Sequence, residues 1–597
     1  MTVRDSAAAL LLFTLVNIAF GLAPADASSA AEILASVRQA TGGDAWDQFG
    51  ECESEGTITV AGKTGTLTYL EDLRTGANVA RLNIPDLWVK QASGVAPNVN
   101  WRQDDAGDIR LLPSGDPWQI DDLYLTSRGY WRPDFGGAAV KVLEPALETG
   151  ATCDRLQIQV PGGHGFTLWI NRATHLIERI ASDSTKYLSD YRPVDGVLLP
   201  FSERRGKSGQ EQVVAMVKRT LLKQVSEAAF AIPFRKDYEM PPSGVVTVPA
   251  QSGIIFQAKI DGKGPYQVMF DTGSVNLMGA NLAKQLGLRL DSSTLKFGAG
   301  GGTIDTQTTH VDTLQIGDLM VHDQTFYVIA SPASDGDTPL AAVGYELMRR
   351  FAVKTDYEHE QLTFYNGPSF TYSGNGTEVP LLTDGRVLAV NGSVDGASGV
   401  FVLDTGNAFG FALESGFVEQ KDLIKLLGAR YHGYAGRGYA GPLAESYYAR
   451  VKTLRMGDAE VTNVIAYLAT GEPAPGEKAG NIGRSVLRQF NVTFDCMRGH
   501  LYLEKNANWG KPGVFNRAGI VIDPMEQGQK VMTVLPGSPG DVAGLAVGDV
   551  ITGIDGQPPG DDSEEPTFLQ PVGTVLHLTV KRGEEVRKIA VTLKEVI

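Results

Sequence analysis

Cysteine, histidine and basic residues are scarce in this chain of 597 residues. Its three cysteines, Cys52, Cys153 and Cys496, and its eight scattered histidines show no spacing typical of a metal site, so we expect neither a metal nor another cofactor. Cys52 and Cys153 are compatible with one disulfide or with two buried thiols, and both alternatives stay open. The 53 basic against 69 acidic residues give a net charge of −16, which argues against nucleic acid as a partner.

Long apolar segments are also missing, except at the N-terminus. Arg4, the apolar stretch Ala7 to Leu22 and an A-x-A-like site at 25–27 are typical of a signal peptide over residues 1–27. An N-terminal membrane anchor is the alternative. No other run reaches about 18 apolar residues, so we expect no membrane span after signal removal. The sequence thus predicts an exported protein, either periplasmic or secreted.

One short motif occurs twice, each time after an apolar run, as Asp271-Thr272-Gly273-Ser274 and as Asp404-Thr405-Gly406-Asn407. A single Asp-Thr-Gly is an ordinary turn signal. Here the surrounding sequence repeats as well, and the matched pairs of segments are 311–318 with 451–458, 341–344 with 480–483, and 351–356 with 490–495. Two copies inside matching repeats indicate two related lobes that bring two carboxylates together.

The order of features in each repeat resembles a known enzyme lobe. An Asp-Thr-Gly turn, a glycine-bearing hairpin, an apolar-apolar-Gly segment and a short helix are similar to the retropepsin-like aspartic protease lobe, and its duplication in one chain resembles pepsin-like enzymes. The resemblance covers lobe one at 243–366 and lobe two at 377–505. It implies a two-lobed β-barrel fold and an aspartic endopeptidase that acts on protein or peptide substrates.

The resemblance also assigns roles to the motif residues. Asp271 and Asp404 would share a proton and activate a water, one as base and one as acid. The threonines would brace the two turns, the glycines would let the turns approach each other, and Ser274 would hydrogen-bond its neighbouring aspartate. The expected supporting residues are Thr272, Gly273, Ser274, Thr405, Gly406 and Asn407. Asn407 departs from the Ser, Thr or Ala usual in the family, which makes asymmetric proton sharing possible.

A protease cleft needs mobile covers that exclude water from the substrate. Two glycine-rich segments lie at the expected distance after the motifs, and both have the composition of hairpin tips. The candidate flap residues are Gly300, Gly301 and Gly302 in lobe one and Gly436, Arg437 and Gly438 in lobe two.

The C-terminal segment, residues 514–597, contains a further recognisable pattern. Val531–Gly540, Ala543–Ile551 and Ile554–Gly556 closely resemble the PDZ modules of bacterial proteases. The resemblance implies a groove in which an extended peptide or a peptide terminus adds a strand beside a carboxylate-binding loop. The matching loop is Arg517-Ala518-Gly519-Ile520. A groove used only for packing within the chain is the alternative.

The N-terminal region, residues 31–235, opens with a short amphipathic helix that carries Ile33, Leu34 and Val37 and continues as alternating strands. With the turn at 190–200 it resembles the curved, helix-plugged half-barrel of bacterial lipoprotein carriers. This analogy implies lipid binding, and a spacer or substrate-docking domain is the alternative.

The sequence therefore predicts a mainly β multidomain protein. Its parts are a curved N-terminal β-sheet domain with a helix, a two-lobed aspartic protease β-barrel and a PDZ domain. The competing interpretation is a noncatalytic, peptide-binding envelope scaffold with a degenerate protease site around Asn407.

Overall fold

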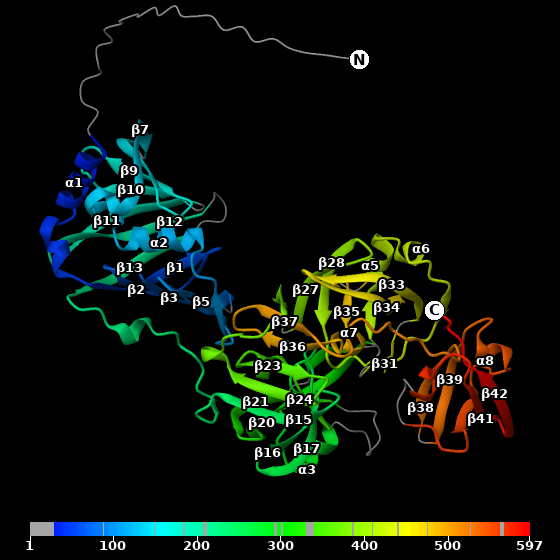
Figure 1. Ribbon diagram of the computed structural model, residues 1–597. Coiled ribbons are helices and arrows are strands. Elements are labelled where there is room, and N and C mark those ends of the chain that lie inside the picture. Colours follow the sequence, from blue (N-terminus) through cyan, green and yellow to red (C-terminus); the bar gives the residue numbers. More distant parts are fainter. Residues whose placement is uncertain are drawn as a thin grey trace, which may run out of the picture. The chain divides into compact units, whose positions relative to one another are not determined.

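The computed structural model describes residues 29–597 apart from 88, 149, 183–184, 207–211, 292–294, 300–301, 330–339, 385–386, 409, 439–440, 444, 474–475, 526 and 561–565 (Figure 1). The chain forms two compact units, one made of residues up to 90, 94–98 and 114–230, and the other of 91–93, 99–113 and 231–597. The predicted signal peptide, 1–27, lies outside the described residues.

The first unit is a long antiparallel sheet with helices. Its elements are α1 (Ala30–Ala40), η1 (Gly43–Gln48), β1 (Glu51–Val60), β2 (Lys63–Asp72), β3 (Asn78–Ile84), η2 (Pro85–Leu87), β4 (Val89–Ala96), α2 (Pro117–Thr126), η3 (Gly129–Trp131), η4 (Pro133–Gly137), β7 (Ala139–Glu148), β8 (Ala151–Gln159), β9 (Phe166–Asn171), β10 (Ile177–Ala181), β11 (Thr185–Val194), β12 (Val197–Arg205), β13 (Gln212–Leu222) and η5 (Glu227–Phe230). The strand order is β4-β3-β2-β1-β13-β12-β11-β10-β9-β8-β7.

Helix α1 forms where the sequence predicts it. The Ser29 hydroxyl accepts from the Glu32 N–H (3.3 Å) and the Glu32 carboxylate accepts from the Ser29 N–H (2.7 Å), so a capping box starts the helix. Ile33, Leu34 and Val37 share one buried face and pack into the core of this unit. The predicted β-sheet domain with a helix is confirmed.

The three cysteines are buried free thiols. Of the two alternatives that the sequence left open for Cys52 and Cys153, the structure has the unpaired thiols.

In the second unit, the first lobe begins after a short segment on the surface. Its elements are β14 (Tyr238–Glu239), β15 (Val245–Gln251), β16 (Ile255–Ile260), β17 (Lys263–Phe270), β18 (Leu277–Gly279), α3 (Ala280–Leu286), β19 (Leu295–Ala299), β20 (Gly302–Ile316), β21 (Leu319–Ile329), β22 (Ala341–Val343), α4 (Tyr345–Met348), β23 (Phe351–Asp356), β24 (Gln361–Asn366) and η6 (Gly367–Ser369). The hairpin β5 (Val99–Gln103) and β6 (Ile109–Leu112) belongs to the same unit, where Asp108 pairs with Arg349 at 2.5 Å.

The second lobe repeats this order. Its elements are β25 (Thr377–Pro380), β26 (Leu382–Asp384), β27 (Val387–Val394), β28 (Ala397–Leu403), β29 (Phe411–Leu413), α5 (Ser415–Gln420), α6 (Leu423–Leu426), β30 (Tyr431–Gly433), β31 (Arg437–Gly438), β32 (Gly441–Pro442), β33 (Ser446–Met456), β34 (Ala459–Ala469), β35 (Gly480–Ile482), α7 (Arg484–Leu487), β36 (Phe490–Asp495) and β37 (His500–Lys505). In lobe one β17 runs parallel to β22, and in lobe two β28 runs parallel to β35.

The two lobes share one sheet and one core. The order β15-β24-β23-β36-β37-β25 crosses from lobe one to lobe two through the antiparallel pair β23–β36, with Lys354 opposite Thr493. The rings of Phe270 and Phe494 meet edge to face at a centroid distance of 6.0 Å. A continuous buried cluster runs through both lobes, so they are rigidly connected through apolar packing.

The C-terminal part is an antiparallel sheet in the order β38-β39-β40-β41-β42. Its elements are β38 (Ile520–Met525), β39 (Gly528–Val534), α8 (Pro539–Val542), β40 (Val550–Ile554), η7 (Pro566–Leu569), β41 (Val575–Arg582) and β42 (Glu585–Thr592). It has its own core around Ile520, Val531 and Phe568.

This C-terminal sheet packs against lobe two. The Phe515 ring lies 5.3 Å from the Tyr448 ring, and Arg450 donates to the Ile597 carbonyl at 3.2 Å and to Glu595 at 3.0 Å. The last residues of the chain are therefore held on lobe two by a guanidinium and by apolar contacts. The order of elements matches the predicted β multidomain architecture, whereas the predicted domain boundaries stay predictions.

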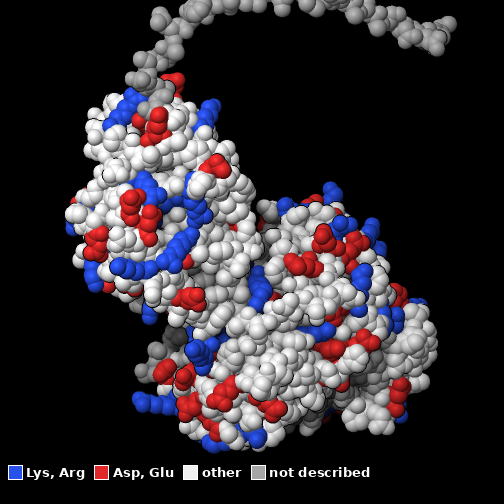
Figure 2. Space-filling model, turned by 60° about the vertical axis from the view of Figure 1, so that its left-hand side comes forward, with Lys and Arg blue, Asp and Glu red and all other residues white. Residues whose placement is uncertain are grey.

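Two general properties bear on binding partners. On the face shown in Figure 2, basic and acidic side chains are interspersed. Among the described helices, none has both the length and the apolar character needed to cross a membrane.

Candidate active site

The two Asp-Thr-Gly turns occupy equivalent positions at the ends of strands. Asp271 follows β17 and its N–H donates to the Val343 carbonyl (2.9 Å), while Asp404 follows β28 and its N–H donates to the Ile482 carbonyl (3.0 Å). Because each aspartate is tied to the end of a parallel partner strand, the repeated sequence places the two carboxylates in matching geometry.

A reciprocal pair of threonines joins the turns. The Thr272 N–H donates to the Thr405 hydroxyl and the Thr405 N–H donates to the Thr272 hydroxyl, both at 3.0 Å. Each hydroxyl then donates across the interface, from Thr272 to the Leu403 carbonyl (2.8 Å) and from Thr405 to the Phe270 carbonyl (2.6 Å). Both threonines are fully buried, so water cannot substitute for any of these four hydrogen bonds if one is lost.

The glycines allow the turns to come this close. A Cβ on Gly273 would lie 2.4 Å from Cγ of Asp404, and a Cβ on Gly406 would lie 2.5 Å from an oxygen of Asp271. Each glycine therefore faces the opposite carboxylate, and the structure brings Asp271 and Asp404 together across the lobe interface.

The environment of Asp271 favours its protonated form. Burial, followed by the negative charge of Asp404 and a hydrogen bond with that carboxyl, raises the pKa of Asp271 well above its ordinary value. The backbone N–H groups of Gly273 (3.0 Å) and Gly406 oppose this shift. The proton on Asp271 is therefore held to higher pH than on an isolated aspartate.

Asp404 has a support that the sequence analysis missed. The Asn481 side-chain amide donates to Oδ2 of Asp404 at 2.7 Å, and the Asn407 N–H donates to Oδ1 at 3.0 Å. The Asn407 side-chain amide donates to Oδ1 of Asn481 at 2.9 Å. The detectable signal was a polar residue in the otherwise apolar segment 480–483, at the position where lobe one has Ala342.

Lobe one has a different arrangement around its aspartate. Among the hydrogen bonds of the described residues, none joins the Ser274 hydroxyl to Asp271, where the resemblance implied one. The Ser274 carbonyl instead accepts from the Tyr345 N–H at 2.9 Å, and Asn276 accepts from the Gly344 N–H at 3.2 Å. The serine thus positions the turn through its backbone.

The candidate flap segments are hairpins to the extent that they are described. Gly300 and Gly301 lie outside the described residues, while Gly302 is exposed at the start of β20, opposite Ala299 of β19. Gly436 is buried, and Arg437 and Gly438 form β31, paired with β32. The role of both segments as flaps stays a prediction.

The base of the lobe-two hairpin contacts the C-terminal sheet. The Tyr434 N–H donates to the Thr533 hydroxyl at 2.9 Å, and the Tyr434 hydroxyl lies 3.3 Å from the Asp523 carboxylate. The Tyr448 hydroxyl donates to the Tyr434 carbonyl. Strands β38 and β39 therefore touch the segment that leads into the candidate flap.

The predicted carboxylate-binding loop forms a turn closed by Asn516. The Ala518 N–H donates to the Asn516 side chain (3.0 Å) and the Gly519 N–H donates to its carbonyl (2.9 Å). The Arg517 guanidinium donates to the Leu569 carbonyl at 2.6 Å. A cavity of about 310 Å³ lies here, lined by Ile520, Val521, Ile522 and Leu569 and, from lobe two, by Ile465, Tyr467 and Arg488.

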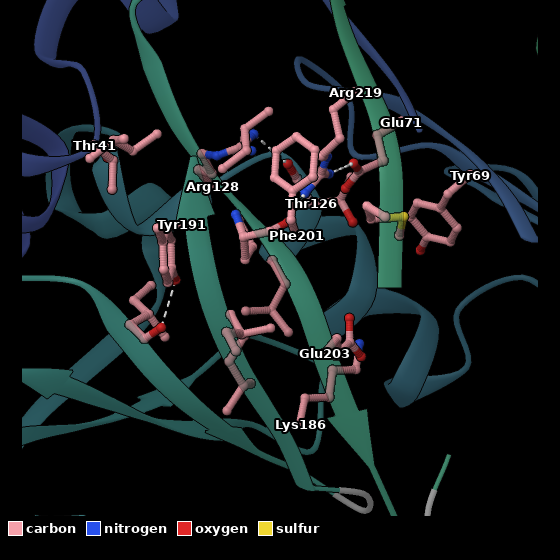
Figure 3. Close-up of a pocket in the computed structure, with 18 of the residues that line it drawn as sticks. Thr41, Tyr69, Glu71, Thr126, Arg128, Lys186, Tyr191, Phe201, Glu203 and Arg219 are labelled. Atoms are coloured by element: carbon pink, nitrogen blue, oxygen red, sulfur yellow. Dashed lines mark hydrogen bonds and ion pairs between the residues drawn. The ribbon is translucent and has the colours of Figure 1, made fainter. Parts of the chain in front are cut away.

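The first unit has a cavity of its own, of about 200 Å³ (Figure 3). Aromatic and aliphatic side chains line it together with charged ones, and Arg219 pairs with Glu71 at 2.9 Å. The Tyr191 hydroxyl donates to the Ile177 carbonyl at 2.6 Å. Val37 of the predicted helix and part of the predicted turn at 190–200 line this cavity, but its charged residues could not be predicted from the sequence because they come from separate elements.

Two known protein families match parts of the second unit. A family model described as aspartyl protease matches residues 256–347, and one described as PDZ domain matches residues 530–582. The chain contains an aspartyl protease domain and a PDZ domain. Both resemblances that the sequence predicted are confirmed, and a general protease-like character follows from them.

One curated relative matches a short segment of the chain, and solved structures match a larger part at low sequence identity. Serine protease HTRA1 of Xenopus tropicalis is 38% identical over 69 residues, which are 12% of this chain and 15% of that protein. A putative outer membrane lipoprotein-sorting protein domain from Vibrio parahaemolyticus has 10% identity and a TM-score of 0.26, covering 34% of this chain and 97% of that chain. The LolA superfamily protein NE2245 from Nitrosomonas europaea has 13% identity and a TM-score of 0.26, covering 34% and 99%.

We predict that Thr405→Val destabilises the lobe interface. Valine keeps the shape of threonine but removes the hydroxyl, which leaves the Phe270 carbonyl and the Thr272 N–H buried without a partner. Such a loss costs about 2–4 kcal/mol of unfolding free energy, measurable by urea denaturation. Thr405→Ser keeps the hydroxyl and is the control. A Thr405→Val protein as stable as the serine variant would contradict the bracing role.

Proposed function

We propose that this protein is an aspartic endopeptidase in which a water between Asp271 and Asp404 attacks the carbonyl carbon of a peptide bond. The observation that supports the proposal is the approach of two carboxyl groups from matching turns, the buried Asp271 and the half-buried Asp404, with the pKa of Asp271 raised by burial and by Asp404. A pair that holds one proton contains both a base and an acid, which is what hydrolysis of an amide needs.

The proposed reaction conserves the proton of the pair. The charged carboxylate takes a proton from the water while the water oxygen bonds to the carbonyl carbon, and the protonated carboxyl gives its proton to the carbonyl oxygen. In the second step the C–N bond breaks, the leaving nitrogen receives a proton from the pair, and the hydroxyl proton returns. The products are a carboxylic acid and an amine, and the dyad is again singly protonated.

The surrounding parts have roles in the same proposal. The hairpins near Gly302 and Gly436 would close over an extended substrate and exclude water. The PDZ domain would recruit protein substrates or partner peptides through an extended segment beside β38. We also propose that the chain is exported, to the periplasm or beyond, because residues 1–27 are typical of a signal peptide.

The test that decides between an enzyme and a noncatalytic scaffold is the removal of either carboxylate. We expect Asp271→Asn and Asp404→Asn each to abolish cleavage of an unfolded protein at acid pH with little loss of stability, because one carboxylate cannot act as both base and acid. Thermal melts check the fold of each variant.

The repeat offers matched controls at equivalent exposed turns. Asp318→Asn in lobe one and Asp458→Asn in lobe two make the same Asp→Asn change at exposed turn residues outside the dyad, and both variants should cleave at the wild-type rate. Wild-type-like activity in either dyad variant would rule out the dyad, and a wild-type protein that cleaves nothing would favour the scaffold.

The recruiting role of the PDZ domain predicts a separate effect on substrate affinity. Gly519 has a φ of +71°, and a Cβ there would lie 2.2 Å from Cβ of Ser538, so Gly519→Ala distorts the predicted peptide-binding loop. We expect KM for protein substrates to rise while kcat on short peptides changes little.

Gly537→Ala is the matched control, because Gly537 has a similar φ of +74° with no atom within 4 Å of the added Cβ. It should leave KM near the wild-type value. Loss of peptide binding by Gly519→Ala would show that the loop is distorted. If KM for a protein substrate is nevertheless unchanged in that variant, recruitment by this loop is contradicted.

A further inference from the structure

The two aspartates of the dyad are supported differently, although their turns repeat. In lobe two both oxygens of Asp404 accept hydrogen bonds from lobe-two donors, the Asn407 N–H at 3.0 Å and the Asn481 amide at 2.7 Å. In lobe one the repeat places Ala342 where lobe two has Asn481, and an alanine side chain has no donor. The difference between the supports of the two aspartates therefore lies in the side-chain amides of lobe two.

The Gly410 carbonyl sets the orientation of the Asn407 and Asn481 side-chain amides. The Gly410 carbonyl can only accept, and the Asn407 side-chain nitrogen lies 3.4 Å from it. The same nitrogen donates to Oδ1 of Asn481 at 2.9 Å, which turns the Asn481 nitrogen toward Asp404. The relay thus presents an N–H to Asp404, and a carboxylate is the form that accepts it best.

Among the described residues of lobe one, no side chain donates to Asp271 as Asn481 donates to Asp404. Oδ1 of Asp271 accepts from the Gly273 N–H at 3.0 Å, and Asp271 shares a hydrogen bond with the Asp404 carboxyl. Burial and the charge of Asp404 raise the pKa of Asp271 well above its ordinary value. Lobe one therefore favours the neutral acid where lobe two favours the anion.

Charged side chains on α4 and α7, the short helices that follow the two apolar-Gly segments, interact with other groups. On α4, the Glu346 carboxylate accepts from the Asn276 N–H at 2.9 Å. On α7, the positive charge of Arg484 acts on the Tyr357 hydroxyl and lowers its pKa against the larger effect of burial, which raises it to about 12. Among charged groups, Asp404 has the largest effect on the pKa of Asp271.

We propose that Asn407 and Asn481 form an amide relay that assigns the roles in the dyad, so that Asp404 is the charged base and Asp271 is the protonated acid. Asn481 and Asn407 are positioning residues, since they act through Asp404. The inference rests on the proposed function. It also gives a role to Asn407 in place of the residue expected there, because its side-chain amide supports Asn481.

The relay predicts a change in one limb of the pH profile. Below the acid limb both carboxyls are protonated and the enzyme is inactive, and the relay stabilises the anion that forms when the first proton leaves the pair. Removing the Asn481 donor makes that anion less stable, so Asn481→Ala should move the acid limb upward by on the order of one pH unit. The alkaline limb reports loss of the Asp271 proton and should move little, because Asp404 is charged before and after that step.

The experiment measures kcat/KM against pH for wild type, Asn481→Ala and Asn407→Ala on one peptide substrate. Asn391→Ala, at an exposed position on β27 of the same lobe, is the matched control and should keep the wild-type profile. Asn407→Ala should shift the acid limb in the same direction by less, since Asn481 remains but is less well oriented. The Asn407→Ala variant also keeps the relay testable if Asn481→Ala fails to fold.

A double-mutant cycle distinguishes a relay from two independent supports. If Asn407 acts through Asn481, then adding Asn407→Ala to Asn481→Ala produces no further shift of the acid limb. Additive shifts, or an active Asn481→Ala enzyme with the wild-type acid limb, would overturn the relay while leaving the aspartic dyad intact. Failure of the proposed function gives a different result, because the wild type would then show no cleavage that depends on Asp271 and Asp404.

Discussion

The reciprocal hydrogen bonds between Thr272 and Thr405 are the constraint on which the candidate site depends. They tie the turn of one lobe to the strand end of the other, and both hydroxyls are used as donor and acceptor in a fully buried place. The shared sheet through β23 and β36 and the common core hold the lobes in the position that these bonds require. Glycines 273 and 406 then leave room for the carboxylates to meet.

An asymmetric amide pair is superimposed on this symmetric frame. The N–H groups of Asp271 and Asp404 make equivalent backbone hydrogen bonds in the two lobes, but Asn481 occupies the position that Ala342 has in lobe one. A symmetric pair of carboxyls has no preferred place for its proton, whereas a donor on one side favours the anion there. A duplicated lobe in one chain allows such a difference, which two identical chains cannot encode.

Much of the fold was predictable because it depends on local patterns and on a repeat. The capping box and apolar spacing of α1, the paired motifs and the glycine turns of the PDZ domain are all visible in the sequence. Asn481 was not assigned, because its contact with Asp404 joins residues 77 positions apart, and neither was the contact of Tyr434 with Thr533. The supposed hydroxyl support by Ser274 came from the family resemblance, and the structure uses the backbone of that residue instead.

The proposed function requires one complete dyad in a single chain, with one carboxylate from each lobe. Mixing the Asp271→Asn and Asp404→Asn variants, each expected to be inactive alone, and measuring peptide cleavage over a range of concentrations tests this requirement. A dyad formed within one chain predicts that every mixture stays inactive. Recovery of activity on mixing, increasing with concentration, would show that the site forms between two chains and would contradict the account.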